Sequence, residues 1–285
     1  MKKGTVVAGL TTLAASGAAL GWWWTHPAVA VRLPSANPEA SAVTASVPAQ
    51  RQTLETALAD YRRQQGMRPG PLPGTWLLQA DSGSGPDRFV GRFGVPYFTA
   101  GPEGRQQALV ALLADTEAAQ GDAMDSFAAA GLVRLLVFEL REGRYRLLAT
   151  HTQPSGAHGM AAADVRPIRM GEAAWGWQLT AGWSHQGYSQ RNVDFFLATP
   201  DDIVPMGRLA VEADNAGAGC GSGAACAPTA LTARWVLRPQ PGQALYALDV
   251  HWQGVLEGRP LKRHLLLEAG AARRYAIPVE LVELF

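Results

Sequence analysis

The sequence predicts a mainly β protein, an antiparallel β-sandwich or barrel-like meander with one or two N-terminal helices. Three observations support this fold class. From Leu132 onward, apolar runs of strand length are separated by turn residues. Within 230–238, apolar and polar residues alternate, as they do in a sheet that has one face in water. Helical spacing of apolar residues is found only in the earlier part of the chain.

The first thirty residues predict export. Lys2 and Lys3 precede an uncharged stretch, residues 4–24, and Ala28-Val29-Ala30 follows it. Basic residues stay on the cytoplasmic side while the apolar segment enters the membrane, so the rest of the chain is expected outside the cytoplasm. Residues 1–30 are therefore a signal peptide or an N-terminal membrane anchor, and the protein is expected in the periplasm or cell envelope.

Two alternatives for this leader remain open. At about 1.5 Å of rise per residue, a helix over 4–24 would span about 30 Å, enough to tether the protein to the inner membrane. Small residues at Ala28 and Ala30 instead fit cleavage by a signal peptidase. Residues 31–50 are rich in Pro, Ala and Ser and poor in large apolar groups, which predicts a disordered linker. A linker of this kind favours the anchor.

Residues 51–285 are predicted to form a single β-rich exported domain. Its first helix is expected near 52–66, where apolar residues recur at i, i+3, i+4 and i+7. A second helix is expected near 102–119, because Pro102 suits a first helical turn and an apolar stripe follows it. The residues of that stripe are Ala108, Leu109, Leu112, Leu113 and Thr116.

Strands are expected mainly between 132 and 285, with two more before the second helix. The turn residues Arg141-Glu142-Gly143 predict a tight hairpin between the first two strands of the later part. The expected strands are 75–80, 88–93, 132–140, 144–152, 172–184, 192–198, 209–213, 230–238, 245–255, 260–268 and 276–284.

Charge argues against a nucleic-acid partner. The whole chain has a formal charge of +1, and removal of residues 1–30 takes away two lysines and no acid, which leaves −1. Binding to nucleic acid normally needs a basic face. The basic cluster Arg259, Lys262, Arg263 and His264 is interpreted as a solvated hairpin end, with contact to an anionic surface as the alternative.

The chain has two cysteines, Cys220 and Cys226, which flank a Gly- and Ala-rich pentapeptide. Two thiols this close in a chain sent to an oxidising compartment are expected to pair. The spacing differs from the C-x-x-C of redox enzymes, so a structural disulfide that holds a surface loop is predicted.

The densest aromatic segment predicts a strand with one buried face. In an extended strand, Trp175, Trp177, Leu179, Ala181 and Trp183 share that face. A flat-ligand platform is the alternative. Where this stripe ends in a turn, polar side chains reach solvent, and the candidate ligand-binding residues are Trp183, His185, Gln186 and Tyr188.

A second candidate site consists of soft metal ligands. His151, His158 and Met160 could bind copper if the Gly-rich loop brought them together, and an ordinary polar loop is the alternative. No other cofactor is expected.

No catalytic residue can be assigned. The segment around Ser184 differs from a nucleophile elbow, because Gln186 stands where that motif needs Gly. The sequence therefore favours a non-catalytic binding or scaffolding domain of the cell envelope, whose partner is an envelope protein or polysaccharide. The alternative is a hydrolase of cell-wall or extracellular polymers that uses dispersed acids.

Overall fold

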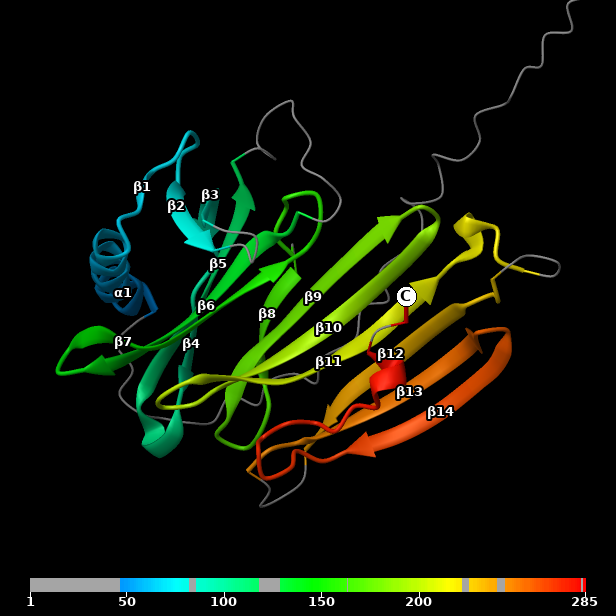
Figure 1. The fold of residues 1–285 in the computed structure, drawn as a ribbon. Helices are drawn as coiled ribbons and strands as arrows, with labels where there is room; N and C mark the ends of the chain where they lie inside the picture. Colours follow the sequence, from blue (N-terminus) through cyan, green and yellow to red (C-terminus); the bar gives the residue numbers. More distant parts are fainter. Residues whose placement is uncertain are drawn as a thin grey trace, which may run out of the picture. The chain divides into compact units, whose positions relative to one another are not determined.

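The described part of the chain is mainly β. A computed structural model describes residues 47–81, 86–117, 129–162, 164–221, 226–239, 244–282 and 284–285. They all belong to the second of two units, Ala45–Phe285. Within them the chain forms one α-helix and two antiparallel sheets of seven strands each, a sandwich-like arrangement (Figure 1). This confirms the predicted fold class.

The leader predicted at residues 1–30, including the stretch 4–24, lies outside the described residues, as does most of the linker 31–50. Among the helices that the structure does describe, none combines the length and apolar character that a membrane span requires.

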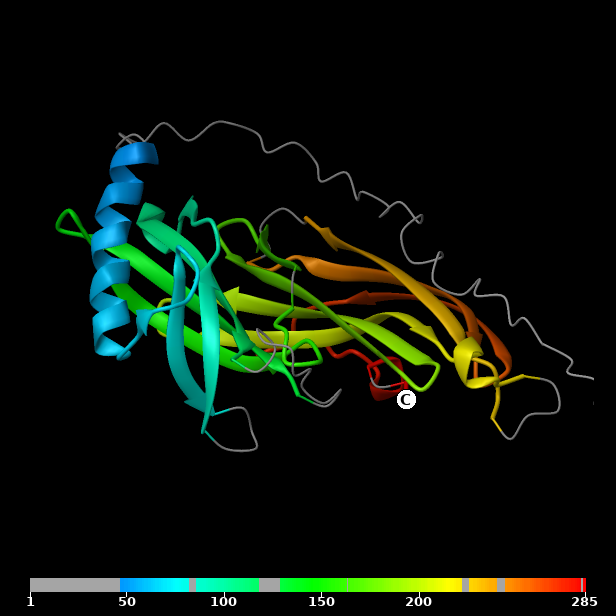
Figure 2. The ribbon, with the colours of Figure 1, turned by 90° about the horizontal axis from the view of Figure 1, so that it is seen from above.

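The helix α1 (Val47–Gln64) confirms the first predicted helix but begins earlier than expected. Residues 47–50, assigned to the linker from their composition, form its first turn, with Pro48 at a position where its missing N–H is tolerated. Leu54, Leu58 and Tyr61 are buried and pack on one face of the first sheet. Figure 2 shows α1 crossing that sheet.

The first sheet has the strand order β1-β2-β3-β5-β6-β7, and β4 also pairs with β5. Its strands are β1 (Arg68–Pro69), β2 (Thr75–Asp81), β3 (Pro86–Phe93), β4 (Tyr97–Ala100), β5 (Gln106–Thr116), β6 (Gly131–Arg141) and β7 (Arg144–Ser155). The short strand β4 pairs with residues 106–109 of β5, and β3 pairs with residues 112–116. Two strands therefore share one edge of β5.

The helix predicted near 102–119 is wrong. The 3-10 turn η1 (Pro102–Gly104) is followed by strand β5, and β5 is buried on both faces. Leu112 packs in the core on the α1 side, whereas Leu109 packs in the core on the other side. A central strand of this kind is apolar at nearly every position, so it also satisfies the i, i+3, i+4 spacing of a helix.

The second sheet is a meander with the order β14-β13-β12-β11-β10-β9-β8. Its strands are β8 (Asp164–Arg169), β9 (Trp175–His185), β10 (Tyr188–Ala198), β11 (Ile203–Asp214), β12 (Ala230–Arg238), β13 (Ala247–Leu256) and β14 (Arg259–Leu267). In β12 the predicted alternation is confirmed, since Leu231 and Trp235 pack in the core while Thr232 and Arg234 are exposed. The pairing between β11 and β12 is short: residues 212–214 of β11 pair with residues 230–232 of β12.

The strand predicted at 276–284 is wrong. This segment contains the 3-10 turn η4 (Val279–Leu281), and the structure describes no ladder there. Leu281 is fully buried in the core of the second sheet, which explains the apolar pattern. Pro278 has no N–H to donate to a neighbouring strand. The segment covers the core with side chains without joining the sheet.

Two apolar cores position the second sheet. One lies between the sheets and joins Leu109, Val133 and Leu135 of the first sheet to Trp177 and Phe196 of the second. The other collects side chains from β10, β13 and the C-terminal segment, which include Phe195, Val250, Trp252 and Tyr275. Adjacent residues Phe195 and Phe196 thus enter different cores, as the strand period of two requires.

A buried ion-pair cluster supports the first sheet. Glu139 is 2% exposed, and its Oε1 lies 2.7 Å from Nε of Arg141 and 3.3 Å from Nη1 of Arg105. Burial alone raises the pKa of Glu139, but the hydrogen bond from Arg141 and the charges of both arginines outweigh it and lower the pKa below the ordinary value. Glu139 is therefore ionised at neutral pH.

Candidate functional site

The turn between β9 and β10 is one of three matching two-residue hairpins in the described part of the chain. His185 pairs with Tyr188, and Gln186 and Gly187 between them have φ of 50° and 84°. Two positive φ values in a two-residue loop define the type I′ turn, whose twist suits antiparallel strands. The same geometry occurs at Glu142-Gly143 and Glu257-Gly258. These repeated Glu-Gly pairs are explained by turn geometry.

The tip of this hairpin contacts a distant segment. A Cβ atom on Gly187 would lie 2.1 Å from the backbone N of Ala218 and 2.1 Å from the carbonyl carbon of Gly217. Both residues belong to the 3-10 turn η3 (Ala216–Ala218). Two constraints therefore favour glycine at position 187: the positive φ, and the close approach of this backbone contact.

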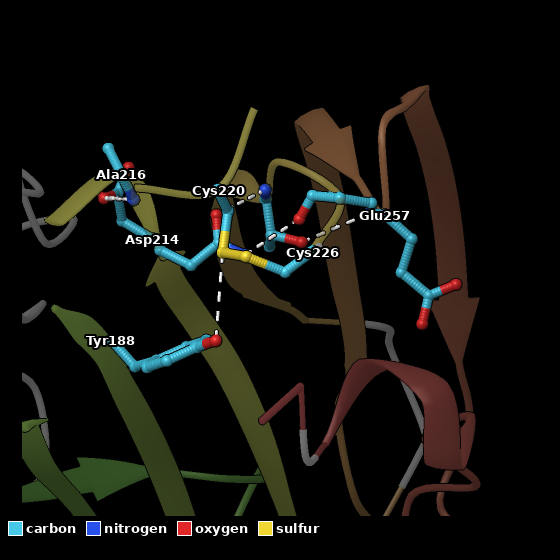
Figure 3. The surroundings of a disulfide bond; sticks show 9 residues. Tyr188, Asp214, Ala216, Cys220, Cys226 and Glu257 are labelled. Atoms are coloured by element: carbon cyan, nitrogen blue, oxygen red, sulfur yellow. Dashed lines mark hydrogen bonds between the residues drawn. A yellow bond between two sulfur atoms is a disulfide. The ribbon is translucent and has the colours of Figure 1, made fainter. Parts of the chain in front are cut away.

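The predicted disulfide is confirmed and lies beside the same turn. Cys220 and Cys226 are bonded, with their Cα atoms 4.9 Å apart. The hydroxyl of Tyr188 lies 3.8 Å from Sγ of Cys220, and Figure 3 shows the ring directed toward the disulfide. The hairpin and the disulfide loop, predicted as separate exposed features, thus form one structure. We call residues 185–188, 216–220 and 226 the disulfide corner.

Buried Asn215 anchors the base of the corner. Its Nδ2 donates to the carbonyl of Ala227 over 2.9 Å, and its Oδ1 accepts from the N–H of Thr229 over 2.8 Å. Asp214 accepts from the N–H of Ala216, also over 2.8 Å (Figure 3). These side chains replace ladder hydrogen bonds where β11 ends, so the start and end of the disulfide loop are held at a fixed separation.

Two of the four candidate ligand-binding residues meet through a third aromatic ring. The ring centroids of Trp183 and Tyr188 lie 6.2 Å and 5.2 Å from that of Phe285, both in edge-to-face geometry. Phe285 is 43% exposed. His185 and Gln186 are exposed at the hairpin tip. Phe285 was not among the predicted site residues, since an isolated aromatic residue carries no periodicity.

The remainder of the aromatic stripe is core. Trp177 is 1% exposed between the two sheets, and Trp175 packs against Tyr97 with ring centroids 4.9 Å apart. This confirms the core interpretation for both residues and leaves Trp183 as the stripe's partly exposed end.

The predicted soft-metal residues have different surroundings. His151 lies on β7 with its ring centroid 5.2 Å from that of Phe196, and its Nε2 is buried without a hydrogen-bond partner. His158 lies in the following turn at φ 54°, and Met160 is 56% exposed. A metal site built from these three residues stays a prediction.

A different set of metal-ligating side chains does converge, on the outer face of β13 and β14. Nε2 of His264 lies 2.7 Å from Oδ1 of Asp249, and Nε2 of His251 lies 3.2 Å from the same oxygen. Nε of Arg238 lies 2.6 Å from the other carboxylate oxygen. Burial raises the pKa of Asp249, but the hydrogen bonds from Arg238 and His264 outweigh it and lower that pKa.

An open pocket of about 470 Å³ lies beside β2 and the end of α1. Its lining includes Arg68, Arg88 and Glu117. Glu117 is the one carboxylate among the described lining residues, and it lies 3.5 Å from Arg88. Hydrolysis by paired acids needs two carboxyl groups across a cleft, so this pocket gives the hydrolase alternative no support.

No protein-family model matches the chain, and comparisons with curated proteins and with solved structures find no significant match.

Proposed function

We propose that this protein is an exported cell-envelope protein whose β domain binds another envelope protein through the disulfide corner and has no catalytic role. Export is supported by the basic and apolar leader, and the disulfide is consistent with an oxidising location.

The observation that carries this proposal is the backbone contact between Gly187 and Gly217, since it joins a hairpin tip and a disulfide loop. A surface fixed in advance loses little conformational entropy when a partner binds. The corner is thus a pre-organised contact surface with exposed polar residues, His185 and Gln186, at its tip.

A protein suits the corner better than a polysaccharide. Sugar rings stack on flat aromatic faces, whereas Phe285 contacts Trp183 and Tyr188 edge-to-face at interplanar angles of 78° and 67°, so the three rings do not form one flat face. Partly exposed Trp and Tyr residues are frequent anchors in protein interfaces.

Site-specific photo-crosslinking in intact cells tests the proposal. A benzophenone amino acid replaces Gln186 in one variant and Glu142 in a matched control, because both residues are exposed and occupy the first turn position of a type I′ hairpin. We expect a discrete crosslinked protein band from position 186 and none from position 142. Equal crosslinking, or none at either position, would contradict the proposal.

Two further measurements test its separate parts. If the purified protein instead co-sediments with isolated cell-wall polysaccharide, and Tyr188→Ala abolishes this, the partner is a polysaccharide. Export is tested by alkylating free thiols in the cell before lysis. Native protein with both cysteines protected is expected, and reduced thiols on protein free in the cytoplasm would contradict export.

A further inference from the structure

Strand geometry places three potential metal ligands on one surface. Asp249 and His251 are two residues apart on β13, so their side chains leave the same face of the sheet. His264 is the register partner of His251 on β14. The intervening Val250 faces the opposite way, into the core of the second sheet. The three polar side chains therefore gather on the outer face.

The two imidazole rings are arranged in parallel. Their centroids lie 4.0 Å apart with an interplanar angle of 7°, and both Nε2 atoms approach Oδ1 of Asp249. All three potential ligand atoms lie within 4.8 Å of one another.

These distances are close to those that a bound ion would set. With metal–ligand bonds of about 2.1 Å and angles between about 90° and 110°, neighbouring ligand atoms lie about 3.0–3.4 Å apart. The observed separations from Oδ1 of Asp249 are 3.2 Å to Nε2 of His251 and 2.7 Å to Nε2 of His264. These two O–N separations differ from that range by about 0.3 Å at most, and the exposed imidazole rings must also turn out of their parallel stack so that both Nε2 lone pairs meet at one ion.

Burial distinguishes the carboxylate from an ordinary surface acid. The Asp249 side chain is 5% exposed although it points away from the core, because Val236 and Leu266 are its register partners on either side. Arg238 binds Oδ2 and fixes the carboxylate orientation, which leaves Oδ1 directed at the imidazoles. The two histidine side chains are more than half exposed, so an ion can reach them from solvent.

We propose that Asp249, His251 and His264 bind one divalent transition-metal ion of the Zn²⁺ type. Two imidazole nitrogens and one carboxylate oxygen are a ligand set that suits Zn²⁺, and the remaining coordination position stays open to water. On binding, the proton that Nε2 shares with Oδ1 of Asp249 in the metal-free form moves to Nδ1 or is released to solvent, so that each neutral imidazole directs an Nε2 lone pair to the ion. Arg238 orients the carboxylate, but its positive charge lowers the affinity for a cation.

Calorimetric titration of the purified full-length protein with ZnCl₂, in a buffer that does not chelate metals, tests this site. We expect one ion per chain and at least tenfold weaker binding for both His251→Gln and His264→Gln, since loss of even an outer-shell partner typically weakens metal binding about 10–100-fold. Gln253→Ala is the control, because Gln253 is an exposed, neutral residue on the same face of β13 as His251, and this variant should bind Zn²⁺ as the original protein does.

Thermal unfolding gives a second readout that also checks folding. Zn²⁺ should raise the midpoint temperature of the original protein and of Gln253→Ala, because an ion that binds the folded state stabilises it. At the same Zn²⁺ concentration each ligand variant should show a smaller rise, although both should unfold cooperatively without metal. Absence of Zn²⁺ binding by the original protein would overturn the proposal, and so would unchanged binding in His251→Gln and His264→Gln or loss of binding in Gln253→Ala with retention in His264→Gln.

Discussion

Replacing Gly187 with alanine tests whether the disulfide corner is a fixed structure. Gly187 has a φ of 84°, and an alanine in this conformation costs about 1 kcal/mol. The added methyl would also lie 2.1 Å from backbone atoms of Gly217 and Ala218. Overpacking of this kind typically costs about 1–3 kcal/mol. We therefore expect Gly187→Ala to lower the free energy of unfolding by about 2–4 kcal/mol in total.

Gly143→Ala is the matched control for this substitution. Gly143 has a φ of 74° in the same type of hairpin, and nothing lies within 4 Å of its added Cβ. It should therefore show only the backbone contribution of about 1 kcal/mol. Equilibrium urea unfolding followed by tryptophan fluorescence, with the disulfide intact, compares the two variants. If both lose the same free energy, the contact between Gly187 and Gly217 does not constrain the corner.

Three further outcomes are expected from urea unfolding. The lowered pKa of Glu139 means that its carboxylate stabilises the fold above the unfolded pKa of about 4.3, and that this stabilisation is lost as the pH falls through the folded pKa. Glu139→Gln should therefore lose less free energy of unfolding between pH 5 and pH 3 than the original protein does. Equal losses in the two proteins would refute this. Replacing both Cys220 and Cys226 with alanine should remove about 2 kcal/mol, the chain-entropy value for so short a loop, and reduction with dithiothreitol should reproduce that loss. Leu112→Ala should cost about 2–5 kcal/mol because Leu112 is fully buried, whereas Leu147→Ala, at a residue 38% exposed, should cost less than about 1 kcal/mol. Similar losses for the two leucines would contradict the burial of Leu112 on the α1 side of β5.

Features that depend on nearby residues were predictable. The hairpin at Glu142-Gly143 follows from turn chemistry, because glycine favours the positive φ that a type I′ turn requires. The pairing of Cys220 with Cys226 was expected from their short separation in sequence together with the predicted export to an oxidising compartment. The alternation of apolar and polar residues identified the buried and exposed faces of β12, because neighbouring side chains of a strand point to opposite sides.

Features that depend on what lies beside a segment were not predictable. Strand β5 and a buried helix have the same apolar spacing, and only its pairing with β3, β4 and β6 decides between them. The C-terminal segment has the composition of a strand, yet its described backbone joins no ladder. His264 was assigned to a solvated hairpin end, because its register partner on β13 cannot be read from the spacing in sequence.

The amino-acid sequence by itself determined the mainly β class, the tight turns and the disulfide, because each follows from residues within one or two turns of chain. Tertiary structure alone decided which surfaces meet. It brings Tyr188 to Cys220 across 32 residues and His264 to Asp249 across 15. Such contacts arise from sheet pairing and packing, and local sequence patterns do not specify the partner.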